Sequence, residues 1–231
     1  IVPVLKFNHQ LARLKFFVRA GSESAAGYKY EGSNWVERKS TDGQDKTLGM
    51  QVTKITLKDM VNVVDMDLAT TTSARNGAST APFVVCSKDV DNKNKLDPDK
   101  GLITPVVPKY PYGHENIPAE GDPDAKGTQV GEPVMFFPNG NISLSIDLKQ
   151  YVEDTKDETD GDKITYKEVE KLDTPLIIDQ SKISKDVKEF KAGASYNVYI
   201  TIYGFEKIEV TAVLTAWEDG GDIETDIEDG K

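Results

Sequence analysis

The side chains that most often carry catalysis are scarce in this sequence. Its 231 residues include one cysteine, Cys86, and two histidines, His9 and His114. Neither histidine has a partner at metal-ligand spacing or a neighbouring serine or cysteine to activate. The glycine-rich phosphate loop and the Gly-x-Ser-x-Gly turn of serine hydrolases are also missing. We therefore predict no catalytic, cofactor-binding or metal-ligating residue, and expect a protein that is not an enzyme.

Cys86 ends the apolar run Pro82–Cys86. A single cysteine cannot form an internal disulfide, and no histidine or other base lies near it in the sequence. The run predicts a small buried hydrophobic side chain, with a nucleophile as the less favoured alternative.

Carboxylates are the abundant reactive groups, but their spacing singles out no site. The run 89–94, followed by Asp97 and Asp99, begins like a calcium-binding loop and lacks its glycine at the sixth position and its glutamate at the twelfth. The acidic run 157–162 is incomplete in the same way. No carboxylate pair stands out as a glycosidase pair. Solvated loops are the favoured interpretation, and cation binding is the alternative.

The overall charge limits the partners of the chain. Asp and Glu number 39 against 28 Lys and Arg, a formal net charge of −11. Such a surface repels a phosphate backbone and an anionic membrane, so we expect no nucleic-acid partner. No run approaches the roughly 20 apolar residues of a membrane-spanning helix, so we expect no transmembrane segment.

Alternating apolar residues predict an all-β fold, since no segment has the pattern of a long amphipathic helix. A two-sheet sandwich is the economical way to bury such strands. The turn residues 138–141 predict a hairpin between two of the strands, and residues 203–207 predict a closing hairpin. A bulge or turn near 9–12 is predicted to separate the strand at 5–7 from the strand at 14–18. The expected strands cover residues 5–7, 14–18, 50–57, 60–68, 133–137, 142–148, 196–202 and 208–214.

The segments between these strands are polar and long. We expect one domain over 1–231, a long loop or insertion at 87–127 and an acidic tail at 218–231. A second acidic loop is predicted at 152–163. The spacing of Ile183, Val187 and Phe190 indicates one or two helical turns.

The two ends of the chain carry a family resemblance. The opening segment Val4–Phe16, VLKFNHQLARLKF, resembles a strand of the Bacteroidales fimbrillins, the major and minor subunits of type V pili. Residues Phe190–Ile200, then Ile208–Leu214 and Ala216–Gly221, resemble the closing hairpin and Trp-containing terminus of that family. In relatives the opening strand lies near the start of the C-terminal domain, so the chain matches mainly that domain.

The resemblance implies a transthyretin-like two-sheet β-sandwich with long loop insertions. It further implies a structural or adhesive pilus (fimbrium) subunit, exported as a lipoprotein to the outer-membrane surface. Such subunits assemble by donor-strand exchange after proteolytic removal of an N-terminal segment. The expected partners are other pilin subunits, with host or bacterial surface receptors or glycans as further candidates.

Strand exchange requires an open sheet edge beside an apolar groove. The alternating faces around residues 2–18 or 196–214 are the two candidates for its border. The tail Glu218–Lys231 lacks apolar alternation and is predicted to be a poor donor strand.

A cell-surface carbohydrate-binding module is the alternative function. Aromatic side chains on loops or sheet edges can stack on sugars, although such residues more often serve packing. The candidate platform residues are Tyr28, Tyr30, Trp35, Tyr110 and Tyr112.

Overall fold

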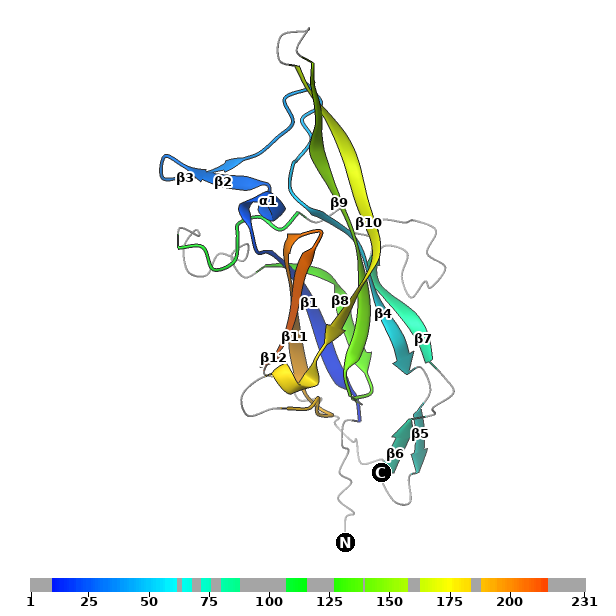
Figure 1. The fold of residues 1–231 in the computed structure, drawn as a ribbon. Coiled ribbons are helices and arrows are strands. Elements are labelled where there is room, and N and C mark those ends of the chain that lie inside the picture. The colour runs from blue at the N-terminus through cyan, green and yellow to red at the C-terminus, as the bar shows by residue number, and fades with distance from the viewer. Residues whose placement is uncertain are drawn as a thin grey trace, which may run out of the picture.

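A computed structural model gives the fold of the chain (Figure 1). The residues that it describes are 10–61, 64–67, 72–75, 80–87, 107–115, 127–138, 140–157, 163–183 and 188–215. The predicted strand at 5–7, His9, the calcium-like run 89–94 and the tail 218–231 lie outside them. Residues 10–12 of the bulge or turn predicted near 9–12 are described, and the first described strand begins at Ala12.

Two four-stranded sheets form a sandwich, which confirms the predicted all-β class. The first sheet has the order β12-β11-β1-β8, with β1 (Ala12–Ala20), β8 (Thr128–Phe136), β11 (Ser195–Gly204) and β12 (Lys207–Thr215). The second has the order β10-β9-β4-β7, with β4 (Gln51–Val61), β7 (Thr80–Ser87), β9 (Ile142–Asp157) and β10 (Lys163–Ile178).

Smaller elements decorate this sandwich. A short helix, α1 (Glu23–Ala26), leads into a hairpin of β2 (Tyr28–Glu31) and β3 (Asn34–Glu37), which projects from the sandwich (Figure 1). A second small hairpin pairs β5 (Val64–Asp67) with β6 (Thr72–Arg75). A 3-10 turn, η1 (Gln180–Lys182), follows β10.

Strand β1 lies in the middle of its sheet. It pairs in parallel with β11 on one side and antiparallel with β8 on the other. Every second side chain points into the core, and each of these is at most 1% exposed: Ala12, Leu14, Phe16, Val18 and Ala20. The alternation in the sequence predicted this buried face, and the structure confirms it.

Aromatic residues close one end of the core. Phe190 packs edge-on between Tyr196, 4.9 Å away, and Phe136, 5.2 Å away, measured between ring centroids. The Tyr196 hydroxyl is satisfied because it accepts a 2.8 Å hydrogen bond from the Lys191 amide. Ile183, at the end of η1, is buried as well. Ile183 and Phe190 of the predicted helical spacing therefore belong to the core, and Val187 lies outside the described residues.

The predicted hairpin over residues 133–148 is wrong. Strands β8 and β9 lie in opposite sheets: β8 pairs with β1, while β9 pairs with β4 and β10. Both strands alternate, and alternation shows which residues face the core without showing the sheet to which a strand belongs. The segment between them crosses from one sheet to the other.

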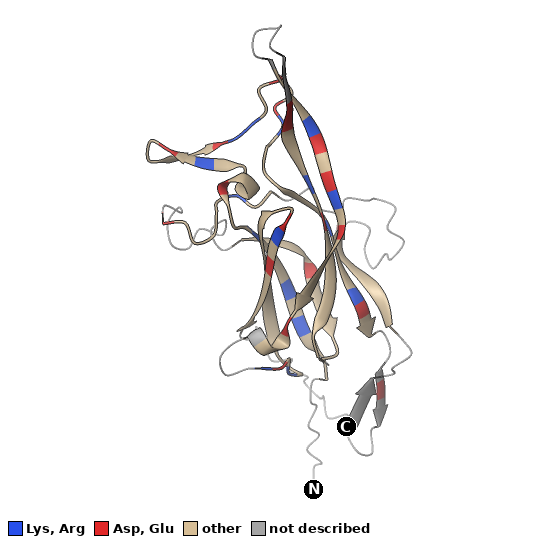
Figure 2. Ribbon diagram, viewed as in Figure 1, with Lys and Arg blue, Asp and Glu red and all other residues tan. Residues whose placement is uncertain are grey.

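The predicted acidic loop at 152–163 is largely strand. Strand β9 continues to Asp157 and β10 begins at Lys163, so the two form a long hairpin that extends past the sandwich (Figure 1). Ion pairs between the two strands replace apolar contacts there. Lys149 Nζ lies 2.9 Å from Glu168 Oε2, and Lys167 Nζ lies 2.6 Å from Asp154 Oδ1. Acidic and basic residues are interspersed along this part of β10 (Figure 2). Charged side chains made the segment look like a loop.

Strands predicted at 50–57 and 60–68 divide differently. β4 runs from Gln51 through Val61 as one strand with an irregularity at Asp59, whose φ is +50°. Residues 64–67 form the separate strand β5. The closing hairpin is confirmed, with β11 and β12 in register from Ser195 opposite Thr215 to Ile202 opposite Ile208.

A glycine in β8 tests how tightly the two sheets close. Gly131 has a φ of +67°, and a Cβ there would lie 2.5 Å from the Val85 carbonyl oxygen of β7. We expect Gly131→Ala to lower the free energy of unfolding by about 2 to 4 kcal/mol, from strain and clash together. Gly140→Ala is the control. Gly140 also has a positive φ, but a Cβ added there would have no atom within 4 Å. Its cost is about 1 kcal/mol. Urea denaturation measures both, and equal losses would contradict the close contact.

Candidate functional site

The sheet order defines which strands lie at edges. These are β12 and β8 in the first sheet and β10 and β7 in the second. Strand β1 has neighbours on both sides, so the described part of the segment 2–18 cannot receive a further strand. The segment 196–214 includes the edge strand β12 and is the remaining candidate of the two.

Two edge strands carry both a proline and a residue with positive φ. In β8 these are Pro133 and Gly131, and in β10 they are Pro175 and Asp173, whose φ is +51°. The pairing register shifts beside both irregularities. Proline removes a backbone donor and a bulge twists the strand, so both features hinder strand addition.

The edges β7 and β8 also protect each other. Pro82 lies in β7. The backbone of β8 at Gly131 approaches Val85 of β7 so closely that a side chain would not fit. This flank of the sandwich is therefore closed.

Strand β12 has none of these protections. It contains no proline and no residue with positive φ. Its charged residues, Lys207 and Glu209, lie next to the turn and pair with each other at 3.2 Å. From Val210 to Thr215 the strand is uncharged. An unprotected edge of this kind is a template for pairing with another strand.

The core beneath β12 is incompletely covered. Residues opposite each other in an antiparallel pair share a face, so Ile208, Val210, Ala212 and Leu214 point inward with the buried residues of β11. Only Ala212 among these four is buried, and Leu214 is 43% exposed. Apolar side chains that face inward yet remain accessible indicate room for a further covering strand.

The other edge strand on this flank, β10, also exposes apolar residues. Leu172 and Ile177 are 63% and 60% exposed, and Ile177 lies opposite the exposed Ser143, so its side chain points to the outer face of its sheet. The two edges are joined near the β11–β12 turn, where Lys171 of β10 donates a 2.8 Å hydrogen bond to the Phe205 carbonyl. The candidate strand-acceptor site is thus the edge strand β12.

The aromatic residues singled out in the sequence gather beside the projecting β2–β3 hairpin. Trp35 lies 5.2 Å from Tyr30 and 5.6 Å from Tyr110, between ring centroids, and Tyr110 lies 5.3 Å from Tyr28. His114, which was not predicted to belong, completes the cluster at 4.8 Å from Trp35.

Their geometry favours packing over a sugar platform. The rings of this aromatic cluster meet edge-on or tilted, so they contact one another and hold the segment 107–115 against the hairpin. Tyr112 stands apart and is 51% exposed, but the Arg19 guanidinium lies 3.6 Å above its ring. The role of these residues in glycan binding stays a prediction.

Cys86 is the remaining reactive side chain that the sequence singled out. Cys86 is 1% exposed, and burial raises the pKa of its thiol to about 12. It is therefore the buried hydrophobic side chain that the sequence predicted. Among the described residues, no three His, Cys, Asp or Glu side chains converge as a metal site. No helix in the described ranges is long and apolar enough to span a membrane.

Comparison with known protein families and with curated proteins finds no match. Among solved structures, a candidate cell adhesion protein of Bacteroides uniformis is similar, with a TM-score of 0.41 and 12% sequence identity. The match covers 91% of this chain and 51% of the other, so the chain spans about half the length of that protein. A likeness of this size assigns neither a fold family nor a function.

The burial of Cys86 predicts low thiol reactivity. We expect native protein to react with a thiol-specific reagent at least about a hundredfold more slowly than unfolded protein at pH 9, because little thiolate forms below pH 12 and access is blocked. Absorbance of the released chromophore measures both rates. Rapid labelling of the folded chain would contradict the buried assignment.

Proposed function

We propose that this chain is a structural or adhesive subunit of a cell-surface pilus that assembles by donor-strand exchange. The single observation that carries the proposal is the unprotected, partly uncovered edge of β12. The resemblance of both ends of the chain to fimbrillins supports it from the sequence. A transthyretin-like topology, export as a lipoprotein and proteolytic processing before assembly belong to the same proposal.

The physics of the edge explains how exchange would work. No described strand pairs with β12 on the side away from β11, so its backbone donors and acceptors there can pair with an incoming strand. An extended strand from another subunit would pair with this row and cover Val210 and Leu214 at the same time. Backbone pairing gives affinity, and the alternate apolar contacts give register.

Polymerisation by this route is head-to-tail. The donated strand and the edge that accepts it are different surfaces of the subunit. The contact therefore does not close on itself as a dimer. Repetition then yields a filament. No catalytic step occurs in this function, and surface receptors or glycans are the further partners proposed for the exposed ends of such a polymer.

A lysine on the edge tests the acceptor role. We expect Val213→Lys, on the 44% exposed Val213 of β12, to abolish the heat-sensitive ladder of polymers on denaturing gels of surface fractions. A charged edge residue opposes pairing with an incoming apolar strand. The readout is an immunoblot of heated and unheated samples.

The matched control is Ile177→Lys on β10, where an exposed apolar residue lies on an edge already interrupted by Asp173 and Pro175. The ladder should persist in this variant. A ladder that survives Val213→Lys and disappears in Ile177→Lys would place the acceptor on β10. Absence of any ladder from the unmodified chain would reject polymerisation.

A further inference from the structure

The second sheet forks at one end. Pairing between β4 and β9 stops at Leu57 opposite Leu144. Beyond that point β4 stays with β7, through Met60 opposite Ala81, while β9 stays with β10, through Ile142 opposite Ile178. Asp59, with its φ of +50°, lies in the bulge where β4 turns away. The split leaves a space between two strands of one sheet.

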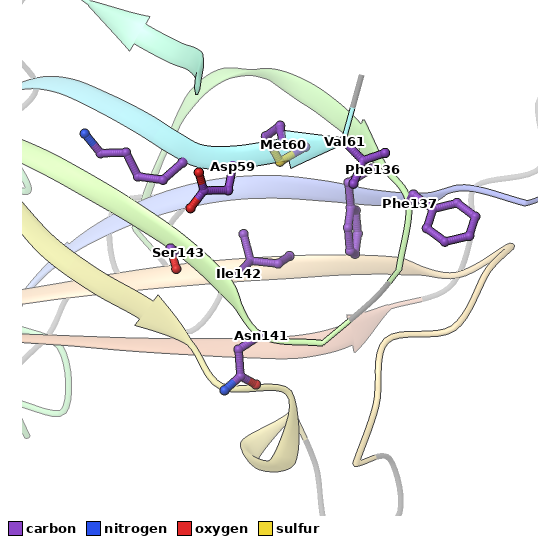
Figure 3. Close-up of a pocket in the computed structure, with 9 residues that line it drawn as sticks. Asp59, Met60, Val61, Phe136, Phe137, Asn141, Ile142 and Ser143 are labelled. Carbon is purple, nitrogen blue, oxygen red and sulfur yellow. The ribbon is translucent and has the colours of Figure 1, made fainter. Parts of the chain in front are cut away.

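A pocket of 260 Å³ occupies this fork (Figure 3). Its apolar wall combines residues of β4 and β9 with Phe136, which belongs to the opposite sheet. Figure 3 shows Asp59 projecting from β4, with Ile142 and Ser143 on β9 across the fork. The lining residues are Lys58, Asp59, Met60, Val61, Phe136, Phe137, Asn141, Ile142 and Ser143.

The polar groups at the rim are unequally engaged. Lys58 is committed to Asp173 at 2.7 Å. The Asn141 side-chain oxygen accepts a 3.0 Å hydrogen bond from the Gln180 amide, which leaves its NH₂ group as a donor. Among the described residues, no hydrogen bond or ion pair is found for the Asp59 carboxylate or the Ser143 hydroxyl, whereas the Ser143 backbone pairs with Ile177 in the sheet. The fork therefore presents a carboxylate, a hydroxyl and an amide beside apolar surface.

These groups restrict the ligand. A purely apolar occupant would cover the Asp59 carboxylate without giving it a partner, which is costly. An anion would be repelled by Asp59 and by the net charge of −11. A bare cation would leave Met60, Phe136 and Phe137 unused. The ligand that satisfies the whole lining has an apolar face, several hydroxyl groups and no charge.

We propose that the fork between β4 and β9 is a binding site for one neutral sugar ring. The C–H face of the ring would pack on Phe136 or Phe137, and its hydroxyls would donate to Asp59 and accept from Asn141. A pocket of 260 Å³ lies just below the range of about 300 to 1,000 Å³ that holds drug-sized ligands, so it suits a single ring. This site is separate from the β12 edge and from the aromatic cluster.

The test is an amide NMR titration of the full chain with methyl glycosides of glucose, galactose, mannose, fucose and N-acetylglucosamine. At least one should cause saturable shifts centred on residues 58–61 and 141–143. Asp59→Asn, which keeps a residue type tolerant of positive φ, should weaken binding about tenfold or more. Phe137→Ala should weaken it about threefold.

Three variants and one peptide separate the outcomes. Asp65→Asn on β5 is the matched carboxylate control and should bind normally. Trp35→Ala should also bind normally, and loss of binding there would overturn the proposal in favour of the aromatic cluster. Shifts by a synthetic peptide of residues 207–215, without shifts by any glycoside, would assign the fork to strand insertion instead. If no glycoside causes any shift, the sugar-binding proposal for the fork is likewise overturned. Asp59→Asn should retain the polymer ladder, so failure here leaves the pilus proposal standing.

Discussion

The pairing of β1 with both β11 and β8 is the constraint on which the rest of the sandwich depends. Because β1, the first described strand, fills the centre of its sheet, it joins the last hairpin, β11–β12, to β8 and fills the middle of the core. This placement forces β12 outward to the edge. The alternating apolar residues of β1, all buried, make the arrangement stable, since each large one contributes roughly 1.5 to 3 kcal/mol on burial.

The two flanks of the sandwich consequently differ. On the β7–β8 flank, prolines and the close approach of Gly131 to Val85 leave no place for another strand. On the β10–β12 flank, the register of β12 with β11 is regular from Thr215 to Ile208, and β12 has inward apolar side chains that nothing fully covers. A monomer with one protected and one open flank has the asymmetry that head-to-tail strand exchange requires.

Sequence patterns predicted the strands that turn one apolar face toward the core, because residues of a strand alternate between its two faces. Residues 14–18, 196–202 and 208–214 are the clear cases. The sequence patterns could not reveal the outer part of the β9–β10 hairpin, because cross-strand ion pairs replace apolar contacts there. They also could not assign β8 and β9 to different sheets, since that depends on contacts distant in sequence.

The candidate sites divide in the same way. Pro82, Pro133 and Pro175 are visible in the sequence, but they identify protected edges only once the strand order is known. The sequence singled out the aromatic residues, and the structure brings four of those five together with His114. The pocket at the fork joins residues 58–61 to residues 136–143, and no local pattern links those segments.

Hydrogen exchange of the β12 amides is the most direct test of the central claim. The exchange rates of residues 207–215 would be compared by mass spectrometry in monomer and in assembled polymer. Donor-strand pairing at this edge predicts strong new protection across β12 on assembly, with little change in β8 and β7. Equal exchange of β12 in the two states, with new protection elsewhere, would contradict the account.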